Sequence, residues 1–180
     1  DVQEEDVGFE GRSRIFDLFI DRDGLIWAMT EGAFNIIEKE PLKPFHLIKR
    51  EKNNPTTLSN SMIWSFFLDS DNTLWMGAGG PVLNKCTGFD NTLPAKFRHY
   101  PVFDKLYTPT AVTCISEDNR GKLWIGTYWG IFTFDRSREK YTPFNTKPAL
   151  DTVFDELVID NIYKDPQGCL WMGSRGWGLY

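Results

Sequence analysis

The sequence predicts an all-β fold assembled from one structural unit that recurs four times along the chain. Tryptophan is found at intervals of 48, 49 and 47 residues, and an aspartate precedes each of these tryptophans by six residues. A glycine or asparagine stands three residues before each tryptophan, and an isoleucine or valine twelve residues before it. The two main columns are Trp27, Trp75, Trp124 and Trp171 with Asp21, Asp69, Asp118 and Asp165. Four columns in register over four copies identify a repeat protein.

The third copy shows most clearly how one unit folds. Two runs of β-forming residues are separated by Asp118-Asn119-Arg120-Gly121. This is the order that a type I turn favours, because Asp bonds its side chain to backbone N–H groups of the turn and Gly accepts a positive φ. The fourth copy, Asp165-Pro166-Gln167-Gly168, adds a proline that suits the same turn, and in the second copy Asn72 replaces the glycine. We therefore expect an antiparallel hairpin in each copy.

Two further strands complete each unit. A break rich in glycine follows each tryptophan and leads to a third strand, and a looser fourth run comes later. Third strands are expected at Phe34–Ile37, Val82–Lys85 and Ile131–Phe134, with the start of one at Leu179–Tyr180, and the fourth runs end near Phe45–Ile48, Phe97–Tyr100 and Tyr141–Phe144. Four short antiparallel strands in about 50 residues make one blade of a β-propeller. The density of Gly, Pro, Asn and β-branched residues disfavours the competing helical repeat.

The expected architecture is thus a partial β-propeller of four-stranded antiparallel blades, with three full repeats and the first half of a fourth. The expected segments are an N-terminal arm at 1–11, blade repeats at 12–58, 59–107 and 108–154, and a truncated repeat at 155–180. An outer strand of a preceding blade is the alternative for the arm. Because the chain starts at Asp1 and stops inside an expected strand, we expect it to be a fragment of a longer protein.

Each repeated residue has an expected structural role. A tryptophan on the second strand can fill the wedge between adjacent blades, where its ring leaves water. A ligand platform is the weaker alternative for these four, since one ligand needs one site and the tryptophans repeat in every blade. The aspartates belong to turns, and no 12-residue calcium loop ending in Glu is present. We expect neither a metal nor a cofactor.

Composition limits the partners. The net charge is −5 with acids and bases interspersed, which argues against nucleic acid. No apolar run approaches the length that spans a bilayer, and no signal peptide is found, so no membrane contact by this segment is expected. The three cysteines have no metal-type spacing. Cys114 and Cys169 fall in expected strands and are predicted to be buried free thiols.

Each copy reads as an apolar strand, Asp-x-x-Gly, apolar-Trp-apolar-Gly-Thr, then Gly and an apolar-aromatic strand. The best matches are Leu123-Trp124-Ile125-Gly126-Thr127 and Leu170-Trp171-Met172-Gly173-Ser174. This pattern resembles the two-component regulator propeller repeat, and the resemblance extends over almost the whole chain. The first copy departs from it with Ala28-Met29-Thr30, and the second has Ala78 in place of Thr.

The resemblance implies a function. Such repeats build the periplasmic sensor region of hybrid two-component histidine kinases of Bacteroides-type bacteria. The chain is then expected to be a periplasmic fragment of a sensor ectodomain that detects glycan-derived oligosaccharides and regulates polysaccharide utilisation, without catalysis of its own. The alternatives are a propeller lyase or hydrolase, which needs clustered acid–base residues near the axis, and a scaffold that binds only protein. Further blades are expected partners, and exposed blade edges could support self-association.

Ligand-binding residues are expected in the loops that follow the tryptophan strands, because side chains there differ between copies. They are Glu31, Tyr128, Trp129, Arg175 and Trp177. Aromatic rings beside charged donors and acceptors suit a sugar, which offers apolar ring faces and hydroxyl edges. The alternative is that Trp129 and Trp177 pack between blades or cover the rim. No catalytic residue is expected, since the lone His46 and His99 have no patterned nucleophile beside them.

Overall fold

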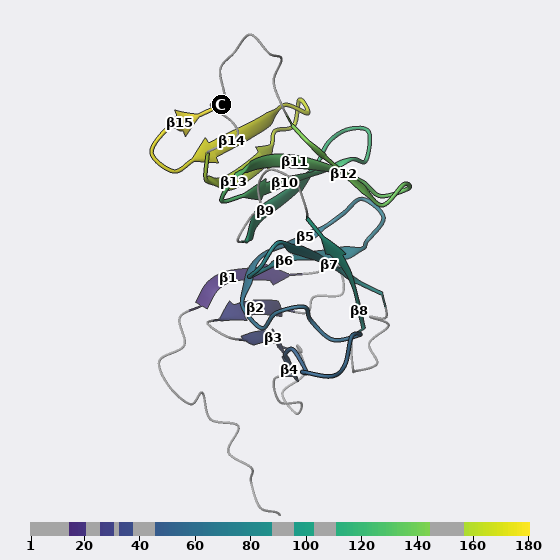
Figure 1. Cartoon of the computed structure of the whole chain (residues 1–180). Helices are drawn as coiled ribbons and strands as arrows, with labels where there is room; N and C mark the ends of the chain where they lie inside the picture. The colour runs from purple at the N-terminus through teal and green to yellow at the C-terminus, as the bar shows by residue number, and fades with distance from the viewer. Residues whose placement is uncertain are drawn as a thin grey trace, which may run out of the picture.

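The computed structural model describes residues 15–20, 26–30, 33–37, 46–87, 96–102, 111–144 and 157–180. The described residues contain no helix, and their strands form four antiparallel sheets (Figure 1). The first sheet consists of β1 (Ile15–Ile20), β2 (Ile26–Thr30), β3 (Ala33–Ile37) and β4 (His46–Ile48). The second consists of β5 (Ile63–Leu68), β6 (Leu74–Ala78), β7 (Val82–Cys86) and β8 (Phe97–Pro101).

The remaining two sheets follow the same plan. The third sheet consists of β9 (Val112–Glu117), β10 (Leu123–Thr127), β11 (Gly130–Asp135) and β12 (Lys140–Pro143). The fourth consists of β13 (Ile159–Lys164), β14 (Leu170–Ser174) and β15 (Gly178–Leu179). In every sheet each strand pairs with the next one along the chain. The all-β partial propeller predicted from the repeat is confirmed.

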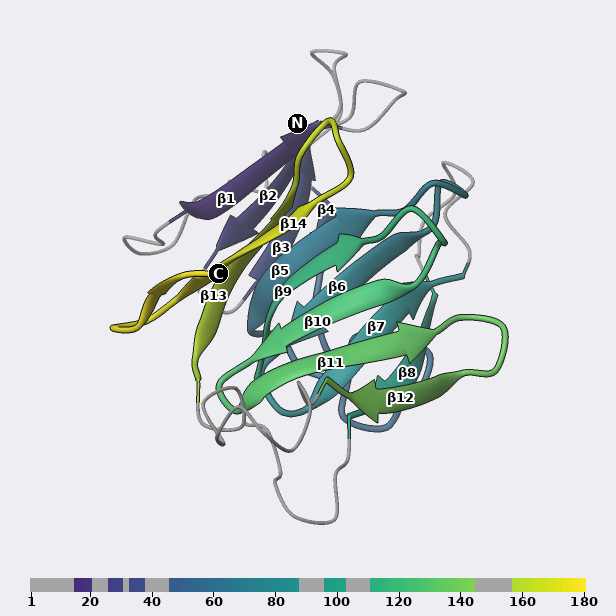
Figure 2. The same ribbon diagram turned by 90° about the horizontal axis from the view of Figure 1, so that it is seen from above.

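The first strands of the second, third and fourth sheets lie beside one another. The sheets succeed each other in chain order, and β9 contacts both β5 of the preceding sheet and β13 of the following one (Figures 1 and 2). The register of each first strand shifts near its start, as between Ile63 and Ser65 and between Ile159 and Asn161. Such a shift re-aims the side chains beside it. The side chains near the start of β5, β9 and β13 therefore converge from three sheets.

The hairpin turns have the geometry that their residues favour. Gly121 N donates to Asp118 O at 3.1 Å, and Asp118 N donates to Lys122 O at 3.0 Å. The glycine has φ 76°, and the equivalent Asn72 has φ 61°. Asp118 Oδ1 also accepts from the backbone N–H groups of Arg120 and Lys122. The turn is thus closed by its own aspartate.

The repeated tryptophans lie at different depths. Trp75 is 1% exposed and packs against Tyr100 of its own sheet and Phe134 of the next sheet, with ring centroids 5.9 and 5.7 Å away. Trp124 is half-buried against the core between the third and fourth sheets. Trp171 differs from the expectation, because it is 45% exposed. No described sheet lies beyond the fourth one to cover it.

Two repeated glycines allow the sheets to approach. A Cβ at Gly77 would lie 2.4 Å from Val112 O, and a Cβ at Gly126 would lie 2.3 Å from Cys114 Sγ and 2.9 Å from Ile159 Cγ2. Val112 and Ile159 begin the first strand of the next sheet in each case. A Cβ at the equivalent Gly173 would meet nothing within 4 Å. Gly77 and Gly126, which follow Trp75 and Trp124 by two residues, therefore make room for the neighbouring blade.

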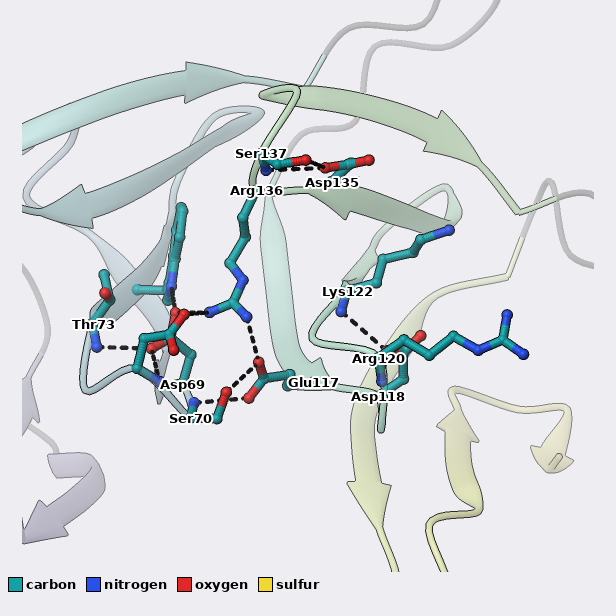
Figure 3. Close-up of polar contacts among 12 residues, drawn as sticks. Asp69, Ser70, Thr73, Glu117, Asp118, Arg120, Lys122, Asp135, Arg136 and Ser137 are labelled. Atoms are coloured by element: carbon teal, nitrogen blue, oxygen red, sulfur yellow. Dashed lines mark hydrogen bonds and ion pairs between the residues drawn. The ribbon is translucent and has the colours of Figure 1, made fainter.

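An ionic network joins the second and third sheets at their aspartate turns (Figure 3). Arg136, which follows β11, places Nη1 2.6 Å from Asp69 Oδ2 and Nη2 2.8 Å from Glu117 Oε1. Glu117 also accepts from Ser70 N and Ser70 Oγ, each at 2.8 Å. Burial alone would lower the pKa of Arg136, but the bond to Asp69 and the surrounding carboxylates raise it. The network fixes one sheet on the other through groups that are mostly withdrawn from water.

Some of the sequence predictions concern residues outside the described ranges, and one prediction is wrong. The arm at 1–11, Asp21 and Glu31 lie outside them. Cys114 is a buried free thiol and Cys86 is buried, but the predicted burial of Cys169 is wrong. Cys169 precedes β14 and is exposed, because it belongs to the turn rather than to the strand. Across the described part of the chain there is no helix with the length and apolar character needed to cross a membrane.

Candidate ligand pocket

A pocket of about 480 Å³ lies where the first strands of three sheets meet. Met62 directly precedes β5, and Trp64 lies on that strand. β9 contributes Thr113, and β13 contributes Asp160 and Asn161. Tyr128 and Arg175, from the loops after β10 and β14, complete the lining. The pocket is thus built by three successive repeats and belongs to none of them alone.

An arginine–aspartate pair lies on one side of the pocket. Arg175 Nε donates to Asp160 Oδ2 at 3.1 Å, and Nη2 donates to Oδ1 at 2.7 Å. The hydrogen bond and charge of Asp160 raise the pKa of the Arg175 guanidinium above its ordinary value. The backbone N–H of Arg175 also donates to Val158 O at 2.9 Å, which ties its loop to the chain just before β13. Loop and strand therefore place the pair together.

Aromatic rings lie beside the ion pair. The guanidinium carbon of Arg175 lies 5.6 Å from the centroid of the Tyr128 ring. Tyr128 in turn meets Trp64 edge to face, with centroids 6.0 Å apart and an interplanar angle of 88°. Trp64 is 37% exposed, so part of the indole is open to a ligand. The row Arg175–Tyr128–Trp64 crosses from the fourth sheet to the second.

The thiol and hydroxyl groups in the deeper part of the pocket are protonated or hydrogen-bonded to the protein. Burial raises the pKa of Cys114 to about 12, so this thiol stays protonated at neutral pH. Ser65 Oγ donates to Val112 O at 3.4 Å, and Thr113 Oγ1 donates to Ile159 O. Both hydroxyl protons are therefore directed to the protein. The polar groups available to a ligand are chiefly those of Asp160, Asn161 and Arg175.

The structure brings together two of the five predicted ligand-binding residues. Tyr128 and Arg175 line the pocket. Trp129 and Trp177 come from the same two loops but are not among the lining residues, and they are 41% and 67% exposed. Glu31 lies outside the described residues.

Sequence reasoning missed Trp64, Asp160 and Asn161. A signal for the first two was present, because Trp64, Thr113 and Asp160 occupy the same place in three copies, directly after the repeated isoleucine or valine. Residue type changes there from copy to copy while the neighbouring columns stay constant. Only the contact of β5, β9 and β13 shows that this variable position faces a common space.

Comparison with known proteins agrees with this architecture. The two component regulator propeller family matches residues 57–80, 107–129 and 153–176, which run from before a first strand to the end of the tryptophan strand or the loop beyond it. The first copy, whose motif departs most from the pattern, is not matched. No curated protein matches the sequence.

Several solved structures share the fold. Virginiamycin B lyase from Staphylococcus aureus aligns with a TM-score of 0.64 at 10% identity, over 92% of this chain and 50% of its own. PorZ, a surface component of the type-IX secretion system of Porphyromonas gingivalis, gives 0.62 at 16% identity, over 94% and 25%. An extracellular domain assigned to a hybrid two component system of B. thetaiotaomicron gives 0.60 at 21% identity, over 89% and 20%. The chain spans half or less of the length of these structures, and the likeness concerns the fold. Three segments of the chain thus match two component regulator propeller repeats.

Proposed function

We propose that this chain is part of the ligand-sensing propeller of a periplasmic receptor in a two-component system, and that an oligosaccharide is its ligand. The observation that carries the proposal is the pocket in which Trp64, Tyr128, Asp160 and Arg175 meet. The family match supports the signalling context, and an extracellular domain with the same fold supports the location.

The pocket has the chemistry that sugar recognition needs. An indole or phenol ring packs against the C–H face of a pyranose. Sugar hydroxyls both donate and accept, so they can bond to Asp160, Asn161 and Arg175 at one time. The volume of about 480 Å³ lies in the range of about 300–1,000 Å³ typical of small-ligand sites, which suits one or two sugar rings.

The described lining residues favour binding over catalysis. None of them is a histidine, and the one carboxylate, Asp160, is tied to Arg175. The Cys114 thiol is protonated at neutral pH. His99 lies elsewhere, with Nε2 2.6 Å from Thr57 O. The likeness to a lyase, at 10% identity, concerns the fold alone.

Binding would act on signalling through geometry. Three blades supply the pocket, so a ligand contacts the second, third and fourth sheets together. A ligand shifts a receptor only by binding one of its states more tightly than another. A ligand that bridges three blades has that differential affinity if the two receptor states differ in how those blades are spaced.

The test is calorimetric titration of the 180-residue chain with a panel of oligosaccharides. We expect at least one binder, and we expect Trp64→Ala and Tyr128→Ala each to weaken it by at least about tenfold, the loss typical of one aromatic stacking contact. Trp171→Ala is the matched control, since its indole is 45% exposed but lies outside this pocket. Trp129→Ala and Trp177→Ala show whether the other two loop indoles take part. Absence of any binder, or wild-type affinity in the Trp64 and Tyr128 variants, would refute the proposal.

A further inference from the structure

The charges of the pocket are balanced. Of the described residues that line it, only Asp160 and Arg175 are charged at neutral pH, and they are opposite in sign. The pair is bidentate, with both carboxylate oxygens engaged. A ligand that enters therefore meets no net charge in the lining, although it meets two strongly polar groups.

The recognition edge of Arg175 is already occupied. A carboxylate is bound best by the fork of two parallel N–H groups on a guanidinium. In this pocket Asp160 takes that place, at 3.1 and 2.7 Å. A carboxylate of a ligand would have to displace Asp160 or lie beside it, where like charges repel each other. Either arrangement weakens the binding of an acidic ligand.

Arg175 is also held against a ring. Its guanidinium carbon lies 5.6 Å from the centroid of Tyr128, whose own ring contacts Trp64. A cation over an aromatic face is attracted by the ring quadrupole. Two partners, Asp160 and Tyr128, thus restrain the guanidinium, so that turning it toward a ligand anion costs both contacts.

Hydroxyl groups are compatible with the pair as it stands. The side chains of Arg175 and Asp160 are 60% and 42% exposed, so a ligand can reach both. Asp160 keeps acceptor positions that the arginine does not use, and Arg175 keeps further N–H donors. A hydroxyl donates to the first and accepts from the second, whereas a carboxylate can only accept.

We propose that the pocket selects an uncharged sugar residue over a uronic acid, and that Asp160 sets this specificity by occupying the guanidinium of Arg175. The inference rests on the proposed function, because it concerns the ligand class of the same pocket. The expected ligand of the pocket is a neutral di- or oligosaccharide that presents adjacent hydroxyls to the ion pair and a C–H face to Trp64.

The experiment compares neutral and acidic sugars in matched pairs, galactobiose with digalacturonate and cellobiose with cellobiouronate, by calorimetric titration of the 180-residue chain. We expect the neutral member of the bound pair to be preferred by at least about tenfold, the size of one charge-assisted hydrogen bond. Asp160→Asn leaves Arg175 uncompensated, so the acidic member should gain at least about tenfold, and the gain should fall as salt is raised.

Asp71→Asn is the matched control. It removes the same charge from another arginine pair, Arg136 with Asp71 at 2.9 Å, at the aspartate turns rather than in the pocket. It should leave the neutral preference unchanged. Thermal unfolding checks that the Asp160→Asn and Asp71→Asn variants fold. If Asp160→Asn does not fold, Arg175→Gln serves as the second variant, and it should retain the preference for neutral sugars.

The outcomes separate the two proposals. Tighter binding of the acidic sugars by the wild-type chain overturns the specificity inference and leaves the proposed function standing. An unchanged preference in a folded Asp160→Asn chain overturns the role of Asp160. Absence of binding by the broader oligosaccharide panel, neutral and acidic alike, refutes the proposed function itself.

Discussion

The indole nitrogen of Trp75 donates a hydrogen bond to Oδ2 of Asp69 at 2.7 Å. The same bond recurs between Trp124 and Asp118 at 3.0 Å and between Trp171 and Asp165 at 2.9 Å. One carboxylate oxygen closes the turn through backbone N–H groups, and the other holds the ring that follows on the next strand. This double use explains why aspartate stands six residues before Trp75, Trp124 and Trp171.

The tryptophan column should show a graded effect on stability. We expect Trp75→Ala to lower the free energy of unfolding by about 3–5 kcal/mol, because it opens a cavity between two sheets. Trp171→Ala should cost only about 1–2 kcal/mol, since 45% of that side chain is already exposed. Urea unfolding of both variants measures the difference, and Trp124→Ala should lie between them. Equal losses at Trp75 and Trp171 would contradict the packing described above.

Substitution of Arg136 should lower the stability of the fold far more than substitution of its exposed neighbour Arg138. Arg136→Met leaves Asp69 and Glu117, whose side chains are 1% and 5% exposed, without their cation. We expect a loss of about 3–5 kcal/mol in the free energy of unfolding. The control is Arg138→Met, because the Arg138 side chain is 80% exposed and its Nε lies 3.8 Å from Asp135 Oδ2. This substitution should change stability by no more than about 0.5 kcal/mol. Similar losses in both variants would mean that burial is not the cause.

Alanine substitutions at Gly77, Gly126 and Gly173 should also differ in their effect on stability. Gly126→Ala places a methyl group against Cys114 and Ile159, and we expect a loss of about 1–3 kcal/mol from overpacking. Gly77→Ala should behave alike. Gly173→Ala should be neutral or stabilise the chain by about 0.5–1 kcal/mol, because a Cβ there has open space and alanine loses less entropy on folding. Denaturant midpoints of the three variants decide the matter, and destabilisation by Gly173→Ala would argue against an open face.

Acid should weaken the fold through the turn aspartates. Burial alone would raise the pKa of Asp118, but hydrogen bonds from Trp124 and from the N–H groups of Lys122 and Arg120 lower it below its ordinary value of 3.8. The unfolded chain therefore takes up this proton at a higher pH than the folded chain. The contribution of Asp118 to stability is fully present above pH 3.8 and is lost as the pH falls through the folded pKa.

Asp118→Asn should accordingly flatten the pH dependence of the free energy of unfolding below the ordinary aspartate pKa. Urea unfolding at a series of pH values measures it, and an NMR titration of the Asp118 carboxyl group gives the folded pKa directly. A folded pKa at or above 3.8 would show that the Trp124 bond does not hold the charged form.

Much of the fold was readable from the sequence because its causes are local. Asp118 and Gly121 set a turn between residues close in the chain, and β-forming runs on either side of a tight turn pair with each other. Repetition of this pattern specified the blades and excluded helices. The burial of Cys169 was misjudged for the same local reason, since its residue type suits a strand interior while its position belongs to a turn.

The pocket and the ionic network were not readable in this way, because they join residues that are distant in sequence. Arg136 bonds to Asp69 across 67 residues, and no spacing rule connects them. Trp64, Tyr128 and Asp160 come together only because the first strands of successive sheets pack side by side. The blade follows from turn chemistry and from strand pairing between near neighbours, so it can be predicted from the order of the residues. Which variable side chains share a pocket and which tryptophan is left uncovered depend on how one sheet packs on the next, so they become visible only in the folded chain.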